Sequence, residues 1–260
     1  MIRLKNEKQI DGIRKSCRML SAMYRELIPL VNPGVQTIEI DKWVQNWIQK
    51  AGGRPAFLGV QGPKNNKYPA AICVSINEEV IHGIPSKRKI REGDLVSLDC
   101  GINLDGFISD QTITLEAGKV SPEARRLNSV TAQCLYAGIK AAKAGDRLLQ
   151  ISRAIFNHAQ EAGFGVVHQF CGHGVGLELH EDPQVTNIPR GPNPKLSGGM
   201  VLALEPMINA GTGDVDILDD GWTVVTADKK LSAHWEHTIA IFRDHTEILT
   251  EPVCGEEKHL

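Results

Sequence analysis

Two stretches of the 260-residue sequence carry histidine, glycine and acidic residues in the same order, and in both the carboxylate comes six residues after the glycine. The first runs from His82-Gly83-Ile84-Pro85 through Gly93 to an apolar segment ending on Asp99, and the second runs from His180-Glu181-Asp182-Pro183 through Gly199 to an apolar segment ending on Glu205. Further along, Asp110-Gln111-Thr112-Ile113 corresponds to Glu236-His237-Thr238-Ile239. This pattern indicates an internal duplication in which each copy contributes two carboxylates.

The four duplicated carboxylates have the chemistry of a metal site. Glu205 and Glu236 lie in apolar segments, where an isolated carboxylate is costly, whereas carboxylates that converge are typical ligands of divalent metal ions. Asn103-Leu104-Asp105-Gly106 is typical of a hairpin turn, and taken as the whole loop it places Asp99 directly opposite Asp110. Two copies related by a pseudo-twofold axis would bring all four acids to one centre.

One histidine is the natural nitrogen ligand for that centre. His173 lies in Gly172-His173-Gly174-Val175-Gly176, where the glycines leave the imidazole accessible. Four carboxylates with one imidazole favour Mn, Fe(II), Co or Zn over a thiolate zinc site. Two bridged ions can activate a water for attack on an amide, with Glu205 shuttling the proton. His82 and His180 would donate to the substrate carbonyl or its oxyanion.

Helices are expected on both sides of these motifs. Apolar residues spaced by three or four predict a first helix, which ends before Pro29: Ile10, Ile13, Cys17, Leu20, Tyr24 and Leu27. A second helix is expected from an N-cap at Thr37 to Gly52, a third from Ser121-Pro122-Glu123, and a fourth from about Asp146 to Gly163. Short strands fill the intervals, and residues 54–69 are expected to form a loop.

The composition of the chain argues against some classes of binding partner. Lys and Arg (29) nearly balance Asp and Glu (31), so no strong field attracts nucleic acid or an anionic membrane. Met1–Lys5 lacks the apolar stretch of a secretion signal, and no run of about eighteen apolar residues could span a bilayer. The six cysteines are scattered, with no Cys-x-x-Cys pair, which favours reduced thiols. We expect a cytoplasmic protein that binds neither nucleic acid nor membranes.

Several of these motifs together resemble a known family, the type I methionine aminopeptidases, over nearly the whole chain. The motifs that carry the resemblance are Phe170-Cys171-Gly172-His173-Gly174-Val175-Gly176 followed by His180, Ser75-Ile76-Asn77-Glu78, His82-Gly83-Ile84-Pro85 and Glu236-His237-Thr238-Ile239. The resemblance implies an α+β pita-bread fold, shared with prolidase and aminopeptidase P, in which two pseudo-twofold-related αβ halves surround a curved antiparallel sheet. It implies one catalytic domain, residues 1–260, with halves of about 1–118 and 119–260.

The same resemblance implies roles for individual residues. Asp99 would chelate one of two divalent ions (Co, Mn, Fe(II), Zn or Ni), His173 and Glu205 would hold the other, and Asp110 and Glu236 would bridge them. His82, His180 and Glu205 would be the catalytic groups. His82 and His180 would also contact the substrate, together with Tyr68, Cys73 and Trp222 of a methionine pocket. Departures from the family pattern fall at Phe57, Val60, Leu179 and a longer segment 61–68.

By this resemblance the enzyme would be a monomer in transient contact with the ribosome, and it would remove the initiator methionine of nascent polypeptides before a small second residue. Two alternatives remain open at this point. A prolidase-like or X-Pro aminopeptidase would share the fold and ligands, and a non-catalytic partner-binding module would lack ligands.

Overall fold

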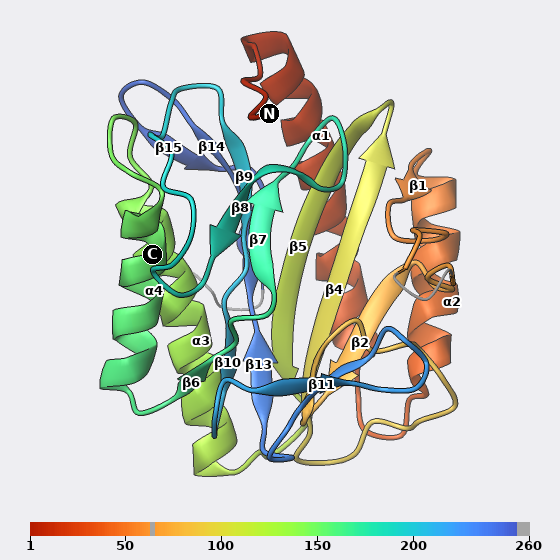
Figure 1. The fold of residues 1–260 in the computed structure, drawn as a ribbon. Coiled ribbons are helices and arrows are strands. Elements are labelled where there is room, and N and C mark those ends of the chain that lie inside the picture. Colours follow the sequence, from red (N-terminus) through yellow and green to blue (C-terminus); the bar gives the residue numbers. More distant parts are fainter. Residues whose placement is uncertain (63–65, 254–260) are drawn as a thin grey trace.

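The computed structural model describes residues 1–62 and 66–253, and is shown in Figure 1. The helices are α1 (Glu7–Leu27), the 3-10 turn η1 (Ile28–Leu30), α2 (Thr37–Lys50), α3 (Pro122–Ala141) and α4 (Leu149–Glu161). The main-sheet strands are β1 (Arg54–Pro55), β2 (Ile72–Ile76), β4 (Leu95–Leu104), β5 (Phe107–Glu116), β7 (Cys171–Gly174), β8 (Glu181–Thr186), β9 (Val201–Leu204), β14 (Glu236–Ile241) and β15 (Thr246–Ile248). The other strands are β3 (Glu79–Ile81), β6 (Gly165–Val166), β10 (Met207–Asn209), β11 (Val215–Ile217), β12 (Val224–Thr226) and β13 (Ser232–His234).

The main sheet is antiparallel throughout and is nearly symmetric about its centre. Its order is β1-β4-β5-β14-β9-β7-β8, with β2 also paired to β4 and β15 to β14. The two duplicated segments meet at the β5–β14 pair, where Glu236 lies opposite Thr112. The equivalent Thr238 donates from Oγ1 to the Asp110 carbonyl at 2.7 Å. The predicted α+β fold with pseudo-twofold halves around an antiparallel sheet is confirmed.

Helices cover one face of this sheet. Helix α1 packs on β4 and β5 and α2 packs on β1 and β2, while α3 packs on β9 and β14 and α4 on β8 (Figure 1). Successive strand residues point to opposite faces. The Gln111 side chain faces α1, where its Oε1 accepts from Ser21 Oγ at 3.2 Å, so the neighbouring Asp110 faces away from the helix. The helix-covered face holds the core, and the opposite face is free to build a site.

Helix boundaries follow the local sequence signals closely. Helix α1 begins with a capping box between Asn6 and Gln9, and α3 begins where the Ser121 hydroxyl accepts from the Ala124 N–H. Thr37 is the first residue of α2 rather than its cap, because Gln36 holds the cap position. Helix α4 begins at Leu149, later than predicted.

The hairpin register differs from the prediction. Asp105 and Gly106 alone form the turn, at φ of 53° and 88°, and Leu104 pairs with Phe107. Asp99 therefore lies opposite Thr112, and Asp110 lies opposite Gly101. The prediction that Asp99 faces Asp110 directly is wrong, but both remain on the same face because the shift is an even number of residues.

Residues 54–69 are not wholly loop, because Arg54 and Pro55 pair with β4 as the short strand β1. Residues 63–65 of the segment 61–68 lie outside the described residues. None of the helices in the described ranges is both long and apolar enough to cross a membrane.

Candidate metal centre

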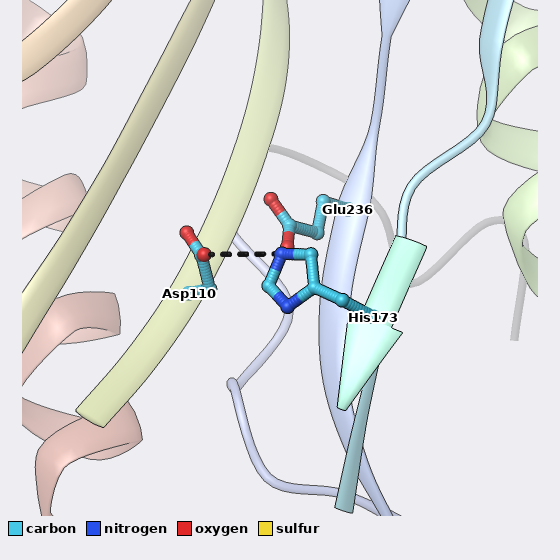
Figure 2. Close-up of side chains that lie close together, drawn as sticks. All are labelled: Asp110, His173 and Glu236. Atoms are coloured by element: carbon cyan, nitrogen blue, oxygen red, sulfur yellow. Dashed lines mark ion pairs between the residues drawn. The ribbon is translucent and has the colours of Figure 1, made fainter. Parts of the chain in front are cut away.

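Three side chains from three strands converge on the uncovered face of the sheet. Asp110 comes from β5, His173 from β7 and Glu236 from β14 (Figure 2). One ligand atom of each lies within 4.8 Å of the others, a spacing that could hold a metal ion. His173 Nε2 is 3.8 Å from Asp110 Oδ2. The duplicated acids of the sequence and the predicted imidazole are therefore brought together.

The two remaining acids adjoin this group. Glu205 directly follows β9, and its Oε1 lies 3.3 Å from His173 Nε2. Asp99 lies opposite Thr112 in the β4–β5 pair, and the Thr112 hydroxyl donates to Glu236 Oε2 at 2.9 Å. Five residues predicted as metal ligands thus line one cavity.

The electrostatics of the acids favour the binding of a cation. Burial, followed by the charges of Glu236, Asp99 and Glu205, raises the pKa of Asp110 well above its usual value. Burial and the charge of Asp99 raise the pKa of Glu205 in the same way. Buried like charges are stable only with a shared proton or a cation between them.

Unpartnered oxygens support the same conclusion. Among the described residues, Asp99 Oδ1, Asp110 Oδ1 and Glu236 Oε1 are buried without a hydrogen-bond partner. Buried polar atoms are nearly always paired, so three unpaired carboxylate oxygens in one cluster call for a ligand that accepts their lone pairs. The residues present therefore fit divalent metal ions, whose preferred ligands are carboxylate oxygens and imidazole.

The histidines around the acids are held neutral. Burial and the neighbouring His180 lower the pKa of His173 to about 3, against smaller raising effects of the Gly174 carbonyl and the Glu181 charge. Its Nδ1 lies 3.0 Å from the Gly174 carbonyl, which fits a protonated Nδ1 and leaves Nε2 with a free lone pair toward the acids. A neutral, oriented imidazole is the form that binds a metal.

His82 is held in a strained backbone conformation. Its φ is 59°, in the left-handed region that non-glycine residues rarely adopt. The next residue, Gly83, fixes this geometry because its carbonyl accepts from Val74 N and Tyr68 Oη. A Cβ at Gly83 would lie 2.4 Å from the Val74 carbonyl oxygen, which explains the glycine after this histidine. Strain of this kind is concentrated at functional sites.

A cavity of about 620 Å³ opens above the acids. All the residues predicted for substrate binding line it: His82, His180, Tyr68, Cys73 and Trp222. Tyr68 and Trp222 pack edge to face with ring centroids 5.1 Å apart, and Cys73 lies opposite Asp99 in the β2–β4 pair. Phe57, Val60 and Leu179, where the chain departs from the family pattern, also line this cavity.

One residue of the site was missed by the sequence reasoning. His234 is 2% exposed, and its Nε2 lies 3.7 Å from Glu205 Oε2. Both of its ring nitrogens are buried without a hydrogen-bond partner in the described part of the chain. Its spacing of two residues from Glu236 is the signal that could have identified it, because residues two apart in extended chain lie on one side.

Comparisons with known proteins agree with this geometry. The sequence profile of metallopeptidase family M24 matches residues 11–242. A methionine aminopeptidase of Treponema pallidum (strain Nichols) is 54% identical over 254 residues, which cover 97% of each chain. The crystal structure of methionine aminopeptidase from Rickettsia prowazekii has a TM-score of 0.92 at 35% identity, covering 96% of this chain and 100% of that one.

The prolidase alternative has weaker support. Prolidase from Pyrococcus furiosus has a TM-score of 0.79 at 22% identity, and the match covers 66% of that chain. Similarity at this level shows a shared fold and nothing more. The full-length match at higher identity decides the assignment, and the chain belongs to metallopeptidase family M24 and, within it, to the methionine aminopeptidases.

Proposed function

We propose that this enzyme hydrolyses the bond after an N-terminal methionine, with preference for peptides that have a small second residue. The observation that carries the proposal is a cluster of four carboxylates, three of them buried and Glu205 only 13% exposed, with one neutral imidazole beneath a partly apolar cavity. The names of the full-length relatives give the same activity.

The proposed metal ligands are Asp99, Asp110, His173, Glu205 and Glu236. Asp110 and Glu236 occupy equivalent places on the two central strands, which suits them to lie between two ions. Asp99 belongs to the first half, and Glu205 and His173 lie together in the second, so each outer group suits one ion. Bound divalent ions supply Lewis acidity toward the scissile carbonyl and lower the pKa of a water.

The chain itself orients the substrate and handles protons. The apolar wall that includes Tyr68, Cys73 and Trp222 suits an unbranched thioether side chain. His82 and His180 line the same cavity and would donate to the carbonyl oxygen as negative charge develops on it. Burial raises the pKa of Glu205, which suits this carboxyl to accept a proton and return it to the leaving amine.

A substrate comparison tests the proposal. The protein is stripped with chelator, restored singly with Co, Mn, Fe(II), Zn or Ni, and assayed on Met-Ala-Ser and Ala-Pro peptides. We expect methionine release only after a metal is restored, with two ions bound per chain by calorimetry. Cleavage of Ala-Pro alone would replace the proposal with the prolidase-like activity. Full activity after thorough chelation would reject metal dependence.

We also propose that the enzyme acts in the cytoplasm as a monomer, as one catalytic domain with halves of about 1–118 and 119–260, and that it contacts the ribosome transiently. The near symmetry of the sheet about β5 and β14 supports the division. Sedimentation of the purified chain, alone and with ribosomes, tests the assembly and the contact.

A further inference from the structure

The first five residues, which we call the N-terminal arm, lie along the segment that carries His180. Three positive groups of the arm pair with three acids of residues 177–182, the His180 loop. The pairs are the Met1 ammonium with Asp182, Arg3 with Glu178, and Lys5 with Glu181. The acids stand on both sides of His180, so the arm contacts the loop before and after this residue.

The Lys5–Glu181 pair differs from the other two in its burial. Lys5 Nζ lies 2.7 Å from Glu181 Oε2, and the two side chains are 1% and 2% exposed. The Arg3 and Glu178 side chains are 52% and 59% exposed. Exposed ion pairs contribute little, whereas a buried pair loses a great deal when one partner is removed. The Lys5–Glu181 pair is therefore the contact with the arm that matters most for the position of the His180 loop.

The same Glu181 carboxylate also accepts hydrogen bonds from the backbone of the loop. Its Oε1 accepts from the backbone N–H groups of Leu177 and Glu178, at 2.8 and 3.1 Å. One carboxylate thus ties the lysine to both ends of the turn that presents His180. The arm is itself anchored, because the Lys5 N–H donates to the Gly199 carbonyl at 2.7 Å.

His180 has few other constraints. Its residue is exposed at the cavity rim, and within the described ranges its ring makes no hydrogen bond. The His180 ring contacts the His173 ring, at a centroid distance of 4.5 Å. A donor to a reacting carbonyl needs a fixed position, and a displacement of about 1 Å can lower the rate by about 10²-fold. The position of His180 is therefore set mainly by the backbone of its loop.

We propose that Lys5 and Glu181 are positioning residues that hold His180 over the metal centre. This inference rests on the proposed function, in which His180 contacts the substrate carbonyl. In the described part of the chain, Lys5 is not one of the residues that line the cavity above the acids. Lys5 therefore affects the reaction by holding Glu181, and with it the His180 loop, in position.

Kinetics of arm variants test the inference. We expect K5M to lower kcat about tenfold with little change in KM, and K5R to retain most of the activity. R125M is the kinetic control, because Arg125 forms an exposed ion pair with Glu116 and does not line the cavity; its kcat should stay within about twofold of the parent. K5M leaves Glu181 buried without a cation, so K5M/E181Q, which removes both charges, is measured beside it and should show the same loss. Wild-type kcat in both variants would overturn the proposal.

A double-mutant cycle separates positioning from general damage. In the H180A background, K5M should cause no further loss of kcat, because the group on which it acts is gone. An equal loss in both backgrounds would show that Lys5 acts elsewhere and would overturn the proposal.

Hydrogen exchange gives a readout that does not depend on activity. The amides of Leu177 and Glu178 should exchange faster in K5M, with metal affinity unchanged. They should exchange at the parent rate in R3M, which removes the exposed Arg3–Glu178 pair of the same arm. If the parent fails to release methionine, the proposed function fails, and the exchange rates still test the tie between arm and loop. Unchanged exchange in K5M would reject that tie.

Discussion

Asp110 and Glu236 are the residues whose replacement is most informative, because their unpartnered oxygens face the same space. D110N and E236Q keep the side-chain volume and remove the charge that a cation requires. We expect each to lower kcat by more than about 10²-fold, a larger loss than is usual for residues that only support a ligand. Calorimetry should show weaker metal binding in both.

The matched control for this pair is D94N. Asp94 is a similarly buried acid, but it accepts from Asn77 and Arg91 in a turn away from the cluster. It should leave metal binding unchanged. Parent-like metal affinity in D110N would remove that residue from the ligand set.

The two proposed carbonyl donors should differ from the ligands in a measurable way. H82A and H180A leave the acids untouched, so the metal content should remain that of the parent. Loss of one donor to a developing oxyanion costs about 10²–10³-fold in kcat. Kinetics with metal analysis of the same samples check this. Loss of metal from either variant would show that the histidine serves the centre instead of the substrate.

The residues of the centre were predictable because their types repeat in order along the chain. Asp99, Asp110, Glu205 and Glu236 all line one cavity, as the duplication suggested. His234 and Lys5 were not predictable in this way. Neither belongs to a duplicated motif, and the positions of both depend on tertiary packing against distant residues.

At the scale of elements, Gly83 sets the course of the chain directly after β3. A side chain there would collide with the Val74 backbone, so G83A should lower the free energy of unfolding by about 1–3 kcal/mol. It should also lower kcat, because His82 precedes it. Chemical denaturation and kinetics check both effects. G106A is the control: its Cβ would meet open space, so only a backbone cost of about 1 kcal/mol is expected, with kcat unchanged.

A second element-scale prediction concerns how α1 is tied to β15. A hydrogen bond from Arg14, opposed by partial burial, lowers the pKa of Glu247. A carboxyl with a lowered folded-state pKa stabilises the fold above its unfolded pKa of about 4.3, and this stabilisation is lost as the pH falls through the folded-state value. E247Q should therefore reduce stability by no more than about 1 kcal/mol at pH 7.

The difference between E247Q and the parent should shrink below pH 4 or so, as the parent carboxyl is protonated. Denaturation curves at several pH values measure it. D11N, which alters a more exposed partner of the same arginine, should have the smaller effect. A pH-independent difference would assign the effect of E247Q to packing.

Element types and helix ends could be predicted, but the hairpin register could not. Capping residues and apolar spacing act locally, which is why α1 ends and α3 begins near the predicted residues. A turn that contains Asp-Gly fits either a two-residue or a four-residue loop. Pairing along the whole length of β4 and β5 selects the shorter one.

For the whole molecule, metal should stabilise the fold as well as activate it. Without a cation the buried acids repel one another, and burial raises the pKa of each. An ion that binds only the folded state stabilises it by about 2.7 kcal/mol at a concentration one hundred times its Kd. Thermal unfolding of the chelated and metal-restored protein should show a clear rise in Tm. The rise should be much smaller in D110N, and an equal rise would place the stabilising ion elsewhere.

The β5–β14 strand pair joins the two halves of the chain through reciprocal hydrogen bonds. Thr112 of one copy supports Glu236 of the other, and Thr238 supports the backbone of Asp110 in return. A chain cut after residue 118 would yield two fragments, each with half of the acids and an open sheet edge. Neither fragment should hold metal alone. When the two fragments are mixed and divalent ions are added, they should reassemble, because the ions bind acids from both. Metal binding by the mixture would therefore measure fragment complementation.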